Sequence, residues 1–252
     1  MKSKIILATM FISISIFGSY SQTIGNMYFT SQKSYYSSPN DAITAFFEGF
    51  RDQDFLKVLG TLDILNSAKQ FDFKKYANRL EAVTWNSLMP SAGKLLANVN
   101  TMIRIGQIST QIRSFIYSIL IRNENTDFSN PVIISGEGAD LGFLNDFSVS
   151  VDENRLSTIE IIMIADPAPS DILNSPRLIT NWKNYASMYG ADLYIEKMVL
   201  FRINGRVMEE GFGLFKYSDG WKIFQLGSNI SGLEIGIAKE ISQTDFEMSF
   251  PK

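Results

Sequence analysis

The stretch Tyr194–Leu226 (YIEKMVLFRINGRVMEEGFGLFKYSDGWKIFQL) decides the fold that we expect for this chain. It is rich in β-branched and aromatic residues, which favour strands. Asn204-Gly205 supplies the two positive-φ residues that a two-residue hairpin turn requires. Ser218-Asp219-Gly220 suits a three-residue turn that closes with a left-handed glycine. The stretch therefore predicts three consecutive antiparallel strands, a β-meander.

The Asn204-Gly205 turn sets the strand register by pairing Ile203 with Arg206. One face is then predicted to carry Ile195, Val199, Phe201, Ile203, Met208, Phe212, Leu214, Phe224 and Leu226. The other is predicted to carry Tyr194, Met198, Leu200, Val207, Phe215, Tyr217, Trp221 and Ile223. Because both faces are apolar, we expect helices to cover one and a ligand or partner to meet the other. Burial of both faces in an ordinary core fits the pattern equally well. The residues predicted for the ligand or partner face are Met198, Leu200, Phe215, Trp221 and Ile223.

Four charged side chains in the meander have two interpretations. Lys197 is a diagonal neighbour of Glu210, and Arg202 of Glu209, which predicts two cross-strand ion pairs. Alternatively, Glu209 or Glu210 is a pocket carboxylate with a raised pKa that abstracts a proton. On the same middle strand, Gly211-Phe212-Gly213 predicts a bulge or strong curvature.

A second clear signal is the start of a helix at Ser38. Ser38 suits the N-cap, Pro39 the first helical position, and Asp41 the acidic position of a capping box. Apolar residues at helical spacing follow at Ile43, Phe46, Phe47 and Phe50. An acidic break then precedes a short helix that begins near Phe55.

The segment SPNDAITAFFEGFRDQDFLKVL, which starts at Ser38, resembles the opening helices of the nuclear-transport-factor-2-like (SnoaL-like, cystatin-like) superfamily. The closing strand Asp219–Phe224 resembles the last strand of those domains. The resemblance implies an α+β fold with N-terminal helices packed on a curved antiparallel sheet that ends in the three-stranded meander. Family domains are shorter than this chain, so residues 63–125 are interpreted as a helical elaboration.

Residues 1–21 have the pattern of a signal peptide. A short basic start is followed by an apolar run from Ile5 to Gly18 and by small residues, which predicts cleavage before Gln22. An uncleaved membrane anchor is the alternative, but the run is shorter than the ~20 residues of a membrane span. We expect a periplasmic or secreted protein without an integral span after signal removal.

The mature chain is predicted to form one α+β domain. Residues 22–37 are a lead-in segment, 38–226 the domain, and 227–252 a loosely packed C-terminal tail. Further elements are expected within the domain: helices over 73–88, 95–120 (in more than one piece) and 178–189, and strands over 132–135, 147–151 and 157–164.

Composition excludes several kinds of site. The chain has no histidine and no cysteine, which excludes disulfides, Ser-His-Asp and Cys-His catalysis and ordinary zinc sites. No acidic loop has calcium-binding spacing, and no glycine motif has the context of a nucleotide site, so we expect neither metal nor cofactor. Loss of Lys2 and Lys4 with the signal changes the net charge from −3 to −5, which argues against a nucleic-acid partner.

These observations favour a non-enzymatic binding or interaction protein that holds an apolar small molecule or a protein partner, with a homodimer through the sheet as one form of partner. The alternative implied by the superfamily resemblance is an isomerase- or dehydratase-like enzyme that uses carboxylate and tyrosine side chains in a cone-shaped pocket. Its weak candidate catalytic residues are Glu209, Glu210, Tyr194 and Tyr217. A structural component of the envelope is a third possibility.

Overall fold

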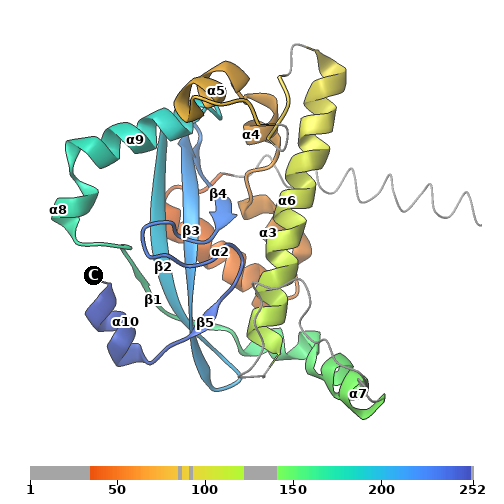
Figure 1. Ribbon diagram of the computed structural model, residues 1–252. Coiled ribbons are helices and arrows are strands. Elements are labelled where there is room, and N and C mark those ends of the chain that lie inside the picture. Colours follow the sequence, from red (N-terminus) through yellow and green to blue (C-terminus); the bar gives the residue numbers. More distant parts are fainter. Residues whose placement is uncertain (1–34, 85–86, 91–92, 122–140, 251–252) are drawn as a thin grey trace, which may run out of the picture.

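The computed structural model describes residues 35–84, 87–90, 93–121 and 141–250 (Figure 1). The signal segment, most of the lead-in segment, and the predicted strand over 132–135 lie outside the described residues. The rest is an α+β fold in which helices surround one antiparallel sheet.

The described residues up to Ile121 are mostly helical. Their helices are α2 (Pro39–Arg51), α3 (Phe55–Thr61), α4 (Leu65–Lys69), α5 (Phe73–Leu80) and the long α6 (Lys94–Leu120). The Ser38 hydroxyl accepts a hydrogen bond from the Asp41 amide at 3.1 Å, which confirms the predicted N-cap. The expected helix over 73–88 is shorter than predicted, and the pieces expected over 95–120 form one continuous helix that starts after Gly93.

The second half builds the sheet. After α7 (Leu141–Ser150) and a 3₁₀ helix η1 (Glu153–Thr158) come β1 (Glu160–Ala165), α8 (Ser170–Leu173), α9 (Pro176–Ser187), β2 (Leu193–Ile203), β3 (Arg206–Tyr217), β4 (Gly220–Leu226), β5 (Lys239–Glu240) and α10 (Gln243–Ser249). The strand order is β1-β2-β3-β4, with β5 paired to β3, and all pairs are antiparallel. The meander and the pairing of Ile203 with Arg206 are confirmed.

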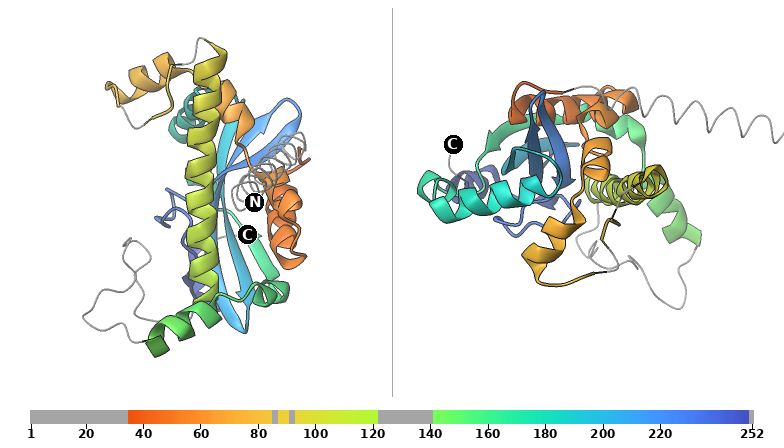
Figure 2. Two further views of the ribbon diagram at one scale, coloured as in Figure 1. Left: turned by 90° about the vertical axis from the view of Figure 1, so that its right-hand side faces the viewer. Right: turned by 90° about the horizontal axis from the view of Figure 1, so that it is seen from above.

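Helices cover one face of the sheet through a core of aromatic rings. Phe46 and Phe47 of α2 and Phe115 of α6 pack against Phe201 of β2 and Phe212 of β3, with ring centroids 4.8–6.1 Å apart. Figure 2 shows α2 on one side of the sheet, α9 on the other, and α6 running along the side of the molecule. The sheet is therefore enclosed between layers.

The chain itself covers the other face as well. Near the β3–β4 turn, Tyr185 and Tyr189 pack on Phe215. Farther along, Leu233 and Phe246, both in the last part of the chain, pack on Met198 and Leu200. The expectation of a loosely packed C-terminal tail is therefore wrong for the described residues up to 250, because Phe246 is fully buried.

The predicted three-residue turn is wrong, and this error misplaced the fourth strand. Tyr217 pairs with Gly220, so the turn holds only Ser218 and Asp219. A glycine is needed at position 220 because a Cβ there would lie 2.5 Å from the Tyr36 carbonyl oxygen. The shorter turn reverses the predicted faces of Trp221, Ile223 and Phe224. Trp221 and Ile223 lie on the face that α2 and α6 cover, called here the helix-covered face, and Phe224 lies on the opposite face. A bulge between Gly213 and Leu214 then returns Leu226 to its predicted face.

Two further expectations are wrong. Residues 147–151 were expected as a strand, but up to Ser150 they belong to α7, because Leu141, Leu144 and Phe147 have a helical spacing that outweighs the short alternation. The predicted ion pairs within the meander do not form. Since β1 flanks β2, Arg202 pairs with Glu160 at 2.7 Å, and Lys197 pairs with Asp166.

Candidate ligand-binding site

A cavity lies where β1 leaves the sheet. The strand ends at Ala165, and Asp166-Pro167-Ala168-Pro169 leads the chain into α8 and then α9. Proline fits this exit because it donates no ladder hydrogen bond. The first residues of β2, from Leu193 to Lys197, extend beyond the end of β1, so a gap is bounded by β2, α8 and α9.

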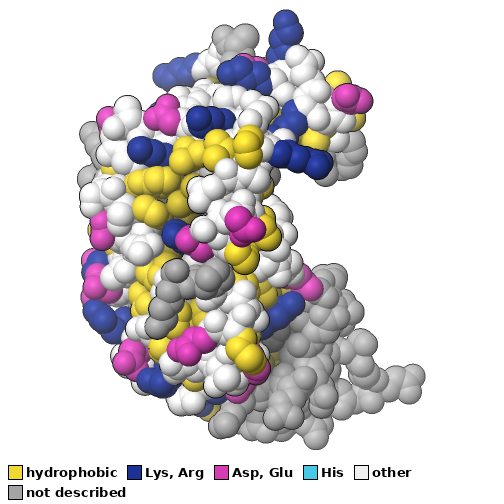
Figure 3. Space-filling model, turned by 90° about the vertical axis from the view of Figure 1, so that its left-hand side faces the viewer, with side chains coloured by type: hydrophobic (Ala, Val, Ile, Leu, Met, Phe, Trp, Pro, Cys, Tyr) yellow, Lys and Arg dark blue, Asp and Glu magenta, His cyan; other side chains and the backbone are white. Residues whose placement is uncertain are grey.

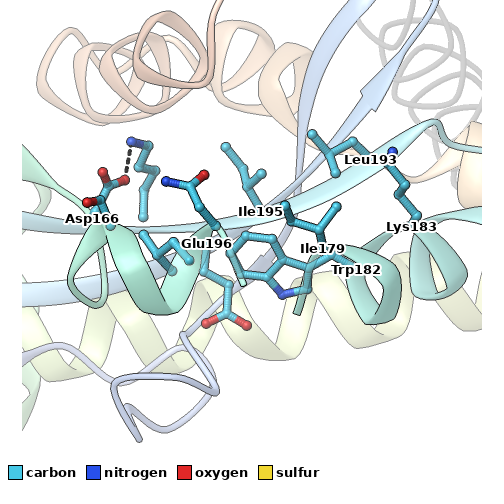
Figure 4. Close-up of a pocket in the computed structure, with 11 residues that line it drawn as sticks. Asp166, Ile179, Trp182, Lys183, Leu193, Ile195 and Glu196 are labelled. Atoms are coloured by element: carbon cyan, nitrogen blue, oxygen red, sulfur yellow. Dashed lines mark hydrogen bonds and ion pairs between the residues drawn. The ribbon is translucent and has the colours of Figure 1, made fainter. Parts of the chain in front are cut away.

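The cavity has a volume of about 370 Å³, within the usual range for small-ligand sites. Its apolar lining comes from three elements: Leu173, Ile179, Trp182, Leu193 and Ile195. Its polar lining is formed by Asp166, Ser170, Asn174, Lys183, Glu196 and Lys197. Figure 4 shows the Trp182 indole beside β2, with Ile195 and Glu196 on opposite sides of the strand.

The charged groups of the cavity differ in how well they are paired. Lys197 forms an ion pair with Asp166, whereas Lys183 is exposed and has no ion-pair partner among the described residues. In the space-filling view of this side of the molecule, hydrophobic side chains form a band that charged side chains border (Figure 3). The cavity therefore combines an apolar floor with a charged rim.

Glu196 is a fully engaged structural carboxylate. It accepts hydrogen bonds from the Tyr194 hydroxyl at 3.0 Å, the Ser228 hydroxyl at 2.6 Å and the Ile230 amide at 3.0 Å. Burial, and then the negative charge of Glu196, raise the pKa of Tyr194 well above its ordinary value. This carboxylate fixes the segment after Leu226 against the sheet and is not free to act as a base.

The two glycines of the middle strand allow this arrangement. A Cβ at Gly213 would lie 2.4 Å from the Tyr194 hydroxyl, and one at Gly211 would lie 2.6 Å from the Ser228 amide nitrogen. The predicted bulge is present beside Gly213. Close approach of other groups therefore requires glycine at both positions.

The residues predicted for a ligand face do not line this cavity. Met198, Leu200 and Phe215 are fully buried beneath the chain's own C-terminal segment and α9. Trp221 and Ile223 lie on the opposite, helix-covered face, so the prediction that all five share one face is wrong for these two. The cavity was missed because its walls come from the Pro-rich exit of β1, which the sequence shows only as the end of a strand.

The weak catalytic candidates are not brought together. The Tyr194 hydroxyl bonds to Glu196 and the Tyr217 hydroxyl to Asp63, 2.7 Å away. Glu210 is fully buried on the face that α2 and α6 cover, and in the described part of the chain its carboxylate accepts a hydrogen bond only from the Gly211 amide. Glu209 points to the other side of β3, where Lys239 is its nearest opposite charge. None of the four lines the cavity.

A buried polar cluster lies at the β3–β4 end of the sheet and was not predicted. Asp63 accepts from the Tyr217 hydroxyl, and burial raises the pKa of Asp63 although Arg104 opposes this. The Arg104 guanidinium donates to the carbonyls of Asp63 and Phe224. Lys222 donates to the Gly60 carbonyl at 2.6 Å, and burial lowers the pKa of Lys222 to about 8. The available signal was charge inside apolar runs, as at Asp63 in TLDIL.

Two other cavities are lined by polar surface groups. One of about 620 Å³ lies between α5 and α9 and includes Lys75, Arg79 and Asn181. Another of about 230 Å³ lies near Arg155 and Arg206. Among the described residues there is no group of three or more carboxylates placed to hold a metal ion. None of the described helices is both long enough and apolar enough to cross a membrane.

Comparison with known proteins bears on the fold alone. No protein-family model and no curated protein matches the chain. Among solved structures, a cystatin-like protein from Ruminococcus gnavus ATCC 29149, determined at 2.10 Å resolution, is similar with 13% identity and a TM-score of 0.48. The match covers 85% of this chain and 43% of that protein, so this chain spans less than half of its length. A likeness at this level carries no argument about function, and membership in the superfamily stays a prediction.

Proposed function

We propose that the protein is an exported, non-enzymatic binding module whose ligand occupies the cavity between β2, α8 and α9. The observation that carries the proposal is the composition of this cavity. It places Trp182, Ile179 and Leu173 beside Lys183, which has no ion-pair partner in the described part of the chain, and its buried lining residues include no unengaged carboxylate. Such a site favours binding of a ligand with an apolar body and an anionic group over proton abstraction.

The export part of the proposal rests on the signal-like residues 1–21. The non-enzymatic part rests on the separation of the candidate catalytic groups. The buried carboxylates Glu196 and Asp63 are held by hydroxyl and amide donors, and Glu210 lies away from the cavity.

Titration of the mature protein with 1-anilinonaphthalene-8-sulfonate tests this function, because the probe combines an apolar body with a sulfonate. We expect saturable binding that is weakened about tenfold or more by Trp182→Ala. Ile172→Ala is the matched control, since Ile172 is on α8 but half exposed and outside the cavity lining.

Near-ultraviolet circular dichroism of both variants identifies any loss of folding. Probe binding that is absent from the folded wild type, or that is equal in the wild type and folded Trp182→Ala, would contradict the proposal.

A further inference from the structure

The first part of β2 has a strand partner on one side only. Leu193–Lys197 pairs with Phe212–Lys216 of β3, whereas the last pair with β1 is Ala165 with Met198. In the described part of the chain no other strand takes the place of β1 beside these five residues. The cavity lies along this edge: Leu193, Ile195, Glu196 and Lys197 line it, and Tyr194 continues the same edge just outside the lining.

The register shows which peptide groups face this edge. Ile203 and Arg206 flank a two-residue turn, so they form a hydrogen-bonded pair, and the direction of the peptide groups alternates along the strand. Leu193, Ile195 and Lys197 therefore bond to β3, while the N–H and C=O groups of Tyr194 and Glu196 point to the open edge.

The sequence prevents β1 from continuing to fill this edge. The pairing of Ala165 with Met198 would place residue 167 opposite Glu196 and residue 169 opposite Tyr194. Both positions are proline, which has no N–H to donate. Neither carbonyl could thus receive a ladder hydrogen bond from this segment.

The outward peptide groups are enclosed and lack partners. Tyr194 and Glu196 are 2% and 3% exposed, and within the described residues no hydrogen bond reaches their outward N–H and C=O groups. Buried peptide groups are ordinarily paired, since leaving them unpaired is unfavourable. A donor and acceptor from outside the described residues would complete this edge.

We infer that the ligand of the cavity is an extended peptide segment of a partner protein, which adds to β2 as a short strand at Tyr194 and Glu196. This inference rests on the proposed function of the cavity. The four unpaired groups belong to alternate residues about 6.8 Å apart, a repeat that an extended backbone matches at every second residue. A compact small molecule does not present donors and acceptors at that repeat.

The walls of the cavity define the peptide further. α8 and α9 flank the edge (Figure 4), so an extended chain that added to β2 would lie between this strand and the two helices. Trp182, Ile179 and Leu173 fit an apolar side chain of the peptide. Lys183 at the rim favours a neighbouring acidic side chain or a terminal carboxylate.

The probe is a heptapeptide obtained by phage display. Random heptapeptides are selected against the immobilised mature protein, and the strongest binder is synthesised. N-methylation of this peptide at alternate residues gives two matched ligands. We expect the set whose N–H groups face β2 to bind about tenfold or more weakly, and the other set to bind like the parent peptide. Amide hydrogen exchange is expected to slow at Tyr194 and Glu196 on binding and to stay unchanged at Ile195 and Lys197.

Any of three results would overturn the inference. These are equal affinities of the two N-methylated peptides, no added protection from exchange at Tyr194 and Glu196, and failure to select any peptide. If the sulfonate probe still binds in a Trp182-dependent way in any of these cases, the proposed binding function stands and only the peptide is excluded. A synthetic peptide of residues 22–34 serves as a further probe. Protection of Tyr194 and Glu196 by that peptide but by no selected sequence would also overturn the assignment to a partner protein.

Discussion

Glu210 is completely buried, and few hydrogen-bond donors reach its carboxylate. One carboxylate oxygen accepts from the Gly211 amide at 3.0 Å, and the other has no partner among the described residues. Burial raises the pKa of Glu210 well above its ordinary value, with the nearby Glu209 acting in the same direction. The side chain is therefore neutral in the folded protein over a pH range in which it is ionised in the unfolded chain.

This difference predicts the effect of Glu210→Gln on the pH dependence of stability. Above the unfolded pKa of about 4.5 the unfolded state releases a proton that the folded state keeps, so wild-type stability falls as pH rises towards the folded pKa. Each unit of the pKa difference is worth about 1.4 kcal/mol. We expect the free energy of unfolding of Glu210→Gln, relative to that of wild type, to increase between pH 4.5 and pH 8 in urea denaturation.

The exposed Glu234→Gln serves as the control for that experiment, because Glu234 has no ion pair among the described residues. Its stability difference from wild type is expected to change little with pH. Parallel pH curves for wild type and Glu210→Gln would show that the side chain does not titrate in this way.

At the scale of elements, the C-terminal segment covers part of the sheet and contributes to the core. Helix α10 begins with Ser242 as its N-cap and places Phe246 on Met198 and Leu200, which would otherwise expose their side chains. The same helix presents Met248 to solvent, 74% exposed.

Phe246→Ala is therefore expected to lower the free energy of unfolding by about 3–5 kcal/mol, the usual cost of emptying a large core site. Met248→Ala on the same helix should change it by less than about 0.5 kcal/mol. Chemical denaturation with circular dichroism compares the two. A similarly small effect for both variants would mean that α10 contributes little to the folded state.

The elements that could be predicted are those with local signals. The Ser38 cap and the Asn204-Gly205 turn depend on adjacent residues, and both occur as expected. The prediction of the β3–β4 turn was wrong because the geometry of this turn depends on Tyr36. The Tyr36 backbone pairs with Trp221, although the two residues are far apart in the chain. The candidate site failed for the same reason: Trp182 and Ile195 are brought together only by the path that α8 and α9 take.

At the scale of the whole molecule, Arg104 joins the helical half of the chain to the sheet. From α6 it reaches the carbonyls of Asp63 and Phe224, and its guanidinium carbon lies 4.0 Å from the centre of the Phe224 ring. Burial lowers the pKa of Arg104, while the carboxylate of Asp63 favours its charged form.

Arg104→Ala is expected to destabilise the protein by about 3–5 kcal/mol, because it leaves Asp63 buried without its cation and two carbonyls without a donor. Arg113→Ala removes an exposed arginine from the same helix and should change stability by at most about 0.5 kcal/mol. Thermal unfolding of the two variants distinguishes them. Equal melting temperatures would show that the buried cluster does not join the two halves energetically.

The core of phenylalanine rings between the helices and the sheet has a consequence for the order in which the chain folds. Phe46, Phe47 and Phe115 are synthesised first, but the rings that they pack on, Phe201 and Phe212, belong to strands near the other end. Until those strands emerge, the helices can pack only on one another, as Phe46 and Phe47 do on Phe115, and they lack the sheet that completes this core. Completion of this core therefore waits for β2 and β3, which are made near the end of the chain.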